Sequence, residues 1–155
     1  MPRQSRIVIP NVPHHITQRG NYRQNVFEED SDYEQYCSWL KEYTEEYDLD
    51  ILAYCLMSNH VHFIVVPCNE DSLARAFNTI HMRYSQYMNR KHNVGGHLWQ
   101  GRFFSCFMDD EHVYRAIKEG EKEKGLRMGA RGFIAKPFNE NELKETIKSV
   151  LEEEK

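Results

Sequence analysis

The sequence predicts an α+β fold in which two helices and an antiparallel sheet form a two-layer sandwich. Two observations support this class. Apolar residues recur at helical spacing in two stretches, near residues 33–47 and 73–88, and short strand-like runs precede, separate and follow them. The chain has 155 residues and is 40% hydrophobic, which is enough to bury one core of ordinary size.

The first expected elements are a strand, a turn and a helix. Residues 14–19 alternate in the manner of a strand, and Gly20-Asn21 directly after them signals a turn. Ser31, with Glu34 three residues later, has the pattern of a capping box and predicts the start of a helix. We expect the apolar stripe of this helix to pack in the core rather than to carry chemistry; it consists of Tyr33, Tyr36, Leu40, Tyr43 and Tyr47.

The middle of the chain predicts a hairpin followed by a second helix. Two apolar runs, residues 51–57 and 61–66, flank a short polar break and are expected to be strands joined by a tight turn. Asp71 or Ser72 can cap the helix that follows. Its expected core stripe consists of Leu73, Phe77, Ile80, Tyr84 and Met88. After it, residues 102–108 predict a further strand.

The hairpin carries a His-x-His pattern directly after its turn at Ser58-Asn59. Because successive side chains of a strand point to opposite faces, His60 and His62 share one face while Val61 lies on the other. The two imidazoles are about 7 Å apart along the strand and can bind one divalent cation between them. The alternative is a pair of hydrogen-bonded histidines at a sheet surface.

The sequence predicts neither a secreted nor a membrane-spanning protein. No apolar run approaches the 18 or so residues of a membrane span, and no apolar segment follows the first charges as in a signal peptide. The four cysteines form no Cys-x-x-Cys pair, and a reduced thiol in an apolar run behaves as a small hydrophobe. We therefore predict a cytoplasmic protein.

The net charge of −4 hides a segregation of charges along the chain. Residues 1–25 contain four arginines and no acid, and residues 72–108 contain five basic residues and no acid. Residues 28–50, in contrast, contain ten acids and one lysine. This pattern predicts a phosphate-binding face built from the two basic segments, with the acidic segment turned away. The alternative is a set of solvated helix faces.

Three segments, in order, resemble the signature segments of the REP-associated tyrosine transposases. They read HITQRGN at residues 15–21, YCLMSNHVHFIVVP at residues 54–67 and GHLWQGRF at residues 96–103. The resemblance extends from about residue 3 to about residue 117. These proteins belong to the insertion-sequence transposases that nick single-stranded DNA with one tyrosine and a His-hydrophobic-His metal site.

The resemblance implies a ferredoxin-like domain that binds DNA hairpins beside a cleavage site. It implies Mg²⁺ or Mn²⁺ on His60 and His62, which polarises the scissile phosphate, and a tyrosine that attacks it to leave a 5′-phosphotyrosyl intermediate. In the family a third ligand follows the tyrosine by about one helical turn, and Glu123 stands near that position. Many relatives act as dimers and REP-associated ones are often monomeric, so the sequence leaves open whether the protein forms a homodimer.

The expected third helix departs from the family pattern. Asp109-Asp110 can cap it, and the family's tyrosine, in a Tyr-Ile-x-x-Asn-Pro-Val motif, is expected near position 119 or 120. This chain has Glu119 and Gly120 there. Tyr114 lies five or six residues earlier, about 1.5 helical turns away and on a different helix face. Tyr114 is therefore a candidate nucleophile only if the helix is repositioned, and core packing is the alternative.

The carboxyl-terminal segment resembles a different family. Residues 129–138 read GARGFIAKPF, which is similar to the last third of a response-regulator receiver domain. In such receivers the lysine that matches Lys136 contacts a phosphorylated aspartate, but the half of the domain that carries the aspartate is absent here. We predict two units, a transposase-like domain over residues 1–118 and a receiver-like strand-helix appendage over residues 119–155.

Three functions follow as hypotheses. The first is a metal-dependent nickase and strand-transferase of single-stranded or hairpin DNA, and the second is a DNA-binding remnant that no longer cleaves. The third, ranked last, is a signalling adaptor that uses the receiver-like segment. For DNA binding the candidates are Arg19, Arg23, Arg83, Arg90 and Arg102 on phosphates, with Trp99 and Tyr87 as stacking surfaces and core packing as the alternative for Trp99.

Overall fold

The computed structural model describes residues 5–109, 111–113 and 115, and six regular elements lie within them. In chain order these are β1 (His14–Arg19), α1 (Asp30–Glu46), β2 (Leu49–Leu56), β3 (His60–Pro67), α2 (Ser72–His92) and β4 (Phe104–Phe107), with a short 3₁₀ turn at Asn21–Arg23. In the described part of the chain, no helix is both long and apolar enough to cross a bilayer.

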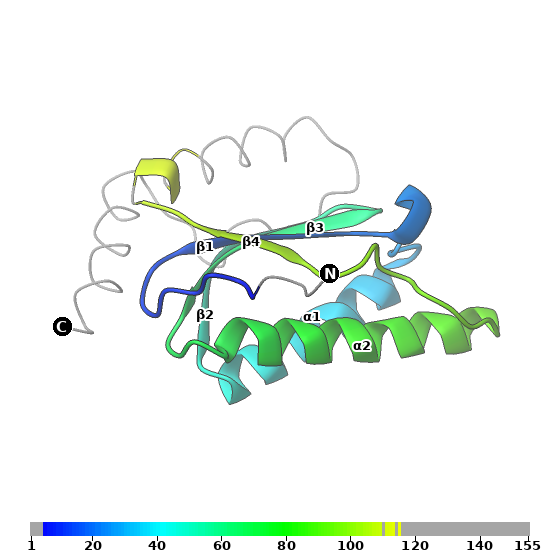
Figure 1. Ribbon diagram of the computed structural model, residues 1–155. Helices are drawn as coiled ribbons and strands as arrows, with labels where there is room; N and C mark the ends of the chain where they lie inside the picture. Colours follow the sequence, from blue (N-terminus) through cyan, green and yellow to red (C-terminus); the bar gives the residue numbers. More distant parts are fainter. Residues whose placement is uncertain (1–4, 110, 114, 116–155) are drawn as a thin grey trace.

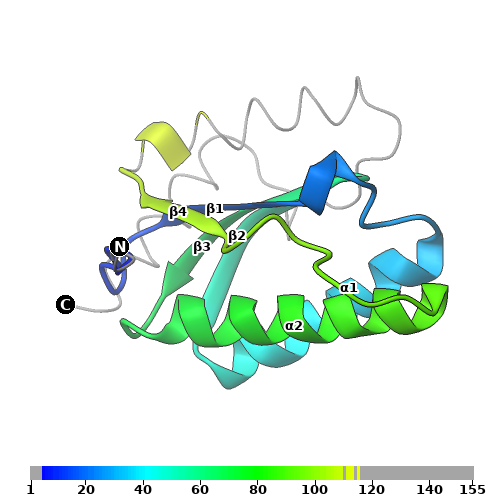
Figure 2. The same ribbon diagram turned by 45° about the vertical axis from the view of Figure 1, so that its right-hand side comes forward.

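The four strands form one antiparallel sheet in the order β2-β3-β1-β4. Both helices lie on the same side of this sheet, as Figures 1 and 2 show. The α+β class with an antiparallel sheet and two helices is therefore confirmed. The βαββαβ order, with β1 and β3 in the centre, is the arrangement of a ferredoxin-like sandwich.

The core lies between the sheet and the helices, and the predicted stripes supply most of it. Alternate side chains of the central strands, such as Ile16 and Phe63, point to the helices and are buried. The predicted stripe of α2 is buried along its whole length. In α1, Tyr36, Leu40 and Tyr43 are buried and the flanking tyrosines pack beside them. The tyrosine stripe thus belongs to the core, as expected.

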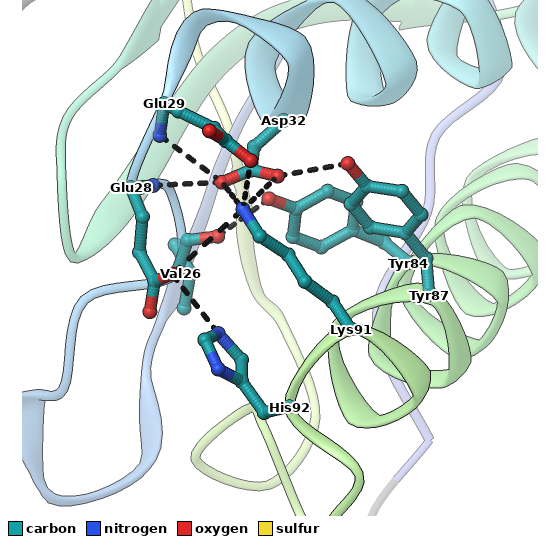
Figure 3. Close-up of polar contacts among 8 residues, drawn as sticks. All are labelled: Val26, Glu28, Glu29, Asp32, Tyr84, Tyr87, Lys91 and His92. Carbon is teal, nitrogen blue, oxygen red and sulfur yellow. Dashed lines mark hydrogen bonds and ion pairs between the residues drawn. The ribbon is translucent and has the colours of Figure 1, made fainter.

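Hydrogen bonds and ion pairs link the start of α1 to the end of α2 (Figure 3). Asp32 is fully buried and accepts hydrogen bonds from Lys91 Nζ (2.9 Å), Tyr87 Oη (2.8 Å) and the backbone N–H of Glu28 (2.9 Å). Burial alone would raise the pKa of the Asp32 carboxyl, but the bonds from Lys91 and the other donors outweigh it and lower that pKa. His92 Nε2 lies 2.9 Å from Glu28 Oε2.

The contacts of Asp32 explain why α1 does not begin where the sequence predicted. The capping box is formed by Glu29 and Asp32 rather than by Ser31 and Glu34, and the helix begins at Asp30. Asp32 takes the capping position because its second oxygen also meets Lys91 from α2, a contact that local sequence does not reveal.

Other predicted strand boundaries shift by one or two residues, and the predictions for the end of the chain fall outside the described residues. The strands expected at 51–57 and 102–108 run over Leu49–Leu56 and Phe104–Phe107. Residues 111–113 are helical, and Asp109 Oδ1 accepts the N–H of His112 at 2.8 Å, which confirms Asp109 as a cap. Tyr114, Glu123 and the receiver-like appendage over residues 119–155 lie outside the described residues.

Candidate functional site

Three histidines lie on the sheet face opposite the helices, which we call the histidine face. On β3, His60 and His62 alternate with the buried Val61 and Phe63, so they point away from the core. Their ring centroids are 4.9 Å apart and the rings are nearly perpendicular, at 87°. The predicted placement of both rings on one face, at the start of the strand, is thus what the structure has.

The ring of His60 is oriented by its neighbour Asn59. His60 Nδ1 lies 2.7 Å from Asn59 Oδ1, while the amide nitrogen of Asn59 donates to the carbonyl oxygen of Arg23 at 3.4 Å. An amide oxygen only accepts hydrogen bonds, so His60 Nδ1 carries the proton of this bond. In the neutral imidazole the lone pair then lies on Nε2, the nitrogen through which this tautomer can bind a metal ion.

The ring of His62 meets a third histidine from the adjacent strand. His15 on β1 lies diagonally across from His62, which pairs with Thr17 in the strand register. His15 Nε2 and His62 Nδ1 are 3.3 Å apart, and the two rings are within 11° of parallel. Burial lowers the pKa of His15, which favours its neutral form.

Cationic side chains flank this end of the sheet. Arg19 is exposed and pairs with His60 in the register of β1 and β3, so their side chains are neighbours on the histidine face. The turn after β1 carries Arg23 and Tyr22, both exposed and both with positive φ, and Tyr22 is 95% exposed. Asn59 links this turn to His60, because its amide group bonds to both.

Two basic residues expected on the phosphate-binding face, Arg83 and Lys91, are held by other partners. Arg83 lies in the helix layer, where its guanidinium donates to Tyr43 Oη and stacks over Trp39 at 4.9 Å. Lys91 is bonded to Asp32, Glu29 and Glu28. The prediction that the acidic segment turns away from both basic segments is therefore wrong, because α1 and α2 lie side by side and their opposite charges pair.

The remaining predicted DNA-binding residues also lie around α2. Trp99 is only 7% exposed, its Nε1 donates to the backbone oxygen of His81 at 3.2 Å, and its ring packs 4.6 Å from the His81 ring, which favours the core alternative. Arg102 is exposed and lines a groove between α2 and residues 97–103. Arg90 is exposed in the last turn of α2, and Tyr87 is held by Asp32.

The histidine face fits a divalent cation in part. Two imidazoles with oriented rings are a common pair of ligands for such ions. In the stretches that the structure covers, no group of three or more His, Cys, Asp or Glu side chains is arranged to hold an ion. A third protein ligand for His60 and His62 would therefore come from elsewhere, and the candidate Glu123 and the candidate nucleophile Tyr114 are outside the described residues.

His15 and Tyr22 were not among the predicted site residues. The alternation of β1 could have placed His15 on one face with Thr17 and Arg19. The sequence does not reveal that β1 pairs with β3, the pairing that brings His15 next to His62. Tyr22 gave no signal beyond its position next to the Gly20-Asn21 turn.

Comparisons with known proteins agree with the resemblance in the sequence. A sequence model of the family described as "Transposase IS200 like" matches residues 9–119. The fold is similar to that of a REP-associated tyrosine transposase bound to a REP hairpin, with a TM-score of 0.61 and 17% identity over 79% of this chain and 74% of that one. It is also similar to a candidate transposase from Deinococcus radiodurans R1, with a TM-score of 0.52 and 15% identity over 80% of this chain and 98% of the other. No curated protein matches the sequence.

Proposed function

The chain belongs to the family of IS200-like transposases, and from this membership we propose that it binds hairpin or single-stranded DNA and nicks it with the help of a divalent cation. The observation that carries this proposal is the pair of imidazoles on the histidine face. His60 and His62 lie on one face at 4.9 Å, with Arg19 beside them and Arg23 in the neighbouring turn.

In the proposed reaction some side chains bind the metal ion and another attacks the phosphate. His60 and His62, with Glu123 as the candidate third ligand, hold Mg²⁺ or Mn²⁺, which when bound neutralises charge on the scissile phosphate. A tyrosine, for which Tyr114 is the candidate, attacks the phosphorus. Its Oη–P bond forms, the P–O3′ bond breaks, and the departing strand leaves with a 3′-hydroxyl while the 5′-phosphate stays on the tyrosine.

The DNA is proposed to approach along the edge that carries Arg19 and Arg23. Both guanidinium groups are exposed and are available to phosphates. Tyr22 supplies an exposed ring on which an unpaired base can stack. Arg90 and Arg102 remain candidates for a more distant part of the DNA, whereas the contacts of Arg83 and Trp99 make them less suited to this role. All of these residues fall within the proposed transposase-like domain, residues 1–118.

A second function, DNA binding without cleavage, is favoured by one specific observation. The sequence has Glu119 and Gly120 where the family's tyrosine is expected. If Tyr114 does not reach the phosphate, the protein would still recognise hairpin DNA through Arg19 and Arg23 but would form no covalent intermediate.

The two functions are separated by incubating the full chain with a labelled hairpin oligonucleotide that has single-stranded flanks, in the presence of Mn²⁺. The nickase predicts a covalent adduct on a denaturing gel, lost in His62→Ala and in Tyr114→Phe and retained in the control His97→Ala, which changes an exposed histidine outside the histidine face. Retention on a native gel without any adduct supports the binding protein. Failure to retain the hairpin at low salt contradicts both.

A further inference from the structure

The contact between His15 and His62 is a hydrogen bond rather than a face-to-face stack. The rings are nearly parallel, yet their centroids are 5.5 Å apart while two of their nitrogens approach to 3.3 Å. Parallel rings that combine a long centroid separation with a short N···N distance meet edge to edge. One nitrogen of the pair must then donate a proton to the other.

The direction of this bond decides what His62 can do. If His15 donates to His62 Nδ1, the proton of neutral His62 lies on Nε2, and His62 has no lone pair for a cation. If His62 Nδ1 donates to His15 Nε2, the lone pair of His62 lies on Nε2. Only the second arrangement agrees with cation binding by His62, so the choice between the two rests on the proposed function.

We infer that His15 is a positioning residue for the metal site: its Nε2 accepts the proton of His62 Nδ1 and thereby holds His62 in the tautomer whose Nε2 can bind a divalent cation. His15 does for His62 what Asn59 does for His60. Both ligand rings are held by Nδ1, at 2.7 Å in His60 and 3.3 Å in His62, and both direct the same nitrogen to the ion.

The strand pairing makes His15 suitable for this role. His15 and His62 belong to β1 and β3, the two central strands, so the backbone hydrogen bonds of the sheet fix the distance between them. His15 acts through His62 rather than as a third ligand, because the described side chains include no group of three that converges on one point. Partners of this kind typically change metal affinity by about 10- to 100-fold.

Two substitutions of His15 show whether its hydrogen-bond acceptor or only its volume matters for metal binding. In His15→Leu the acceptor is lost and the volume is largely kept, whereas in His15→Gln the amide oxygen can reach the position of Nε2 and accept the same bond. The control is His97→Leu, at an exposed position outside the histidine face. Mn²⁺ binding to the full chain, with hairpin DNA present, is measured by titration calorimetry, and the fold of each variant is checked by thermal unfolding.

We expect Mn²⁺ affinity to fall about tenfold or more in His15→Leu, and to stay within a few-fold of the parent in His15→Gln and His97→Leu. A readout independent of metal is the ¹⁵N spectrum of the imidazole nitrogens in the metal-free protein, which should place the proton of His62 on Nδ1. Unchanged affinity in His15→Leu, a proton on His62 Nε2, or equal losses in the Leu and Gln variants would overturn the inference. Absence of Mn²⁺ binding by the parent chain would instead contradict the proposed function, and the ¹⁵N spectrum would still decide the tautomer.

Discussion

Histidines lie on both faces of the sheet, and their surroundings differ. On the helix side, His14 is fully buried and its ring bonds to the backbone of Ile9 and Val12, while His81 is 6% exposed and bonds to Tyr36 Oη at 2.9 Å. On the histidine face, His15, His60 and His62 are partly exposed and contact one another or Asn59. Histidine therefore serves packing on the helix side, whereas on the histidine face it has the role that we propose above, metal binding.

The largest expected effect concerns the helix side, where buried polar groups carry stability. Replacing Asp32 with Ala should lower the free energy of unfolding by about 3–5 kcal/mol, because it leaves the Tyr87 hydroxyl and two backbone N–H groups without their common acceptor and removes one of the acids that bind Lys91. Urea unfolding at pH 7 measures this. Glu34→Ala, an exposed acid of the same helix, is the matched control and should change stability by less than about 0.5 kcal/mol. A loss below 1 kcal/mol in Asp32→Ala would contradict the importance of the cluster.

A pair of histidine substitutions tests the comparison directly. His81→Ala should lower the free energy of unfolding by about 3 kcal/mol, because it opens a cavity among Tyr36, Phe77 and Trp99 and leaves the Tyr36 hydroxyl without a partner. His62→Ala should cost less than about 1 kcal/mol but abolish Mn²⁺ binding. Chemical unfolding and calorimetry on both variants give the answer, and equal losses of stability would mean that the two faces do not differ.

The pH dependence of stability should reflect the buried histidine. Burial lowers the pKa of His81 to about 3, whereas an unfolded histidine has a pKa near 6.5. As the pH falls below 6.5, the unfolded chain takes up a proton that native His81 does not, so stability is lost at about 1.4 kcal/mol per pH unit. Between pH 6.5 and 5 this contribution is about 2 kcal/mol. The side chain of His81→Gln does not titrate, so between pH 6.5 and 5 its free energy of unfolding should fall by about 2 kcal/mol less than that of the parent, as measured by urea unfolding. An equal fall in the two proteins would contradict the low pKa of His81.

The smallest expected effect distinguishes two arginines that sequence alone treats as equals. Arg19→Met should weaken retention of hairpin DNA with single-stranded flanks and reduce the slope of log affinity against log salt by about 0.7 to 0.9, the value of one phosphate contact. Arg83→Met should leave that slope unchanged, because Arg83 is held by Tyr43 and Trp39 in the helix layer. Native-gel titrations at several salt concentrations decide it, and a reversed order would place the DNA on the helix side.

The sequence predicted features set by short-range periodicity and missed those set by pairing between distant segments. The hairpin of β2 and β3, the core stripe of α2 and the shared face of His60 and His62 follow from spacing alone. The start of α1 could not be predicted from spacing, because the position of Asp32 depends on two distant residues. Tyr87 lies 55 residues and Lys91 lies 59 residues further along the chain. The contact between His15 and His62 and the position of Arg83 were missed for the same reason, since both depend on which elements pack side by side.

The adjacent histidines of β1 restrict how this strand can change in evolution. His14 points inward and His15 outward, and each following residue continues that alternation up to Arg19. Substitutions at single positions can be accommodated one at a time, but inserting or deleting one residue between Pro13 and Gly20 would turn part of the strand inside out, with Ile16 sent into solvent or Arg19 into the hydrophobic interior. We therefore expect homologous chains to vary in composition here while keeping the length of this segment constant.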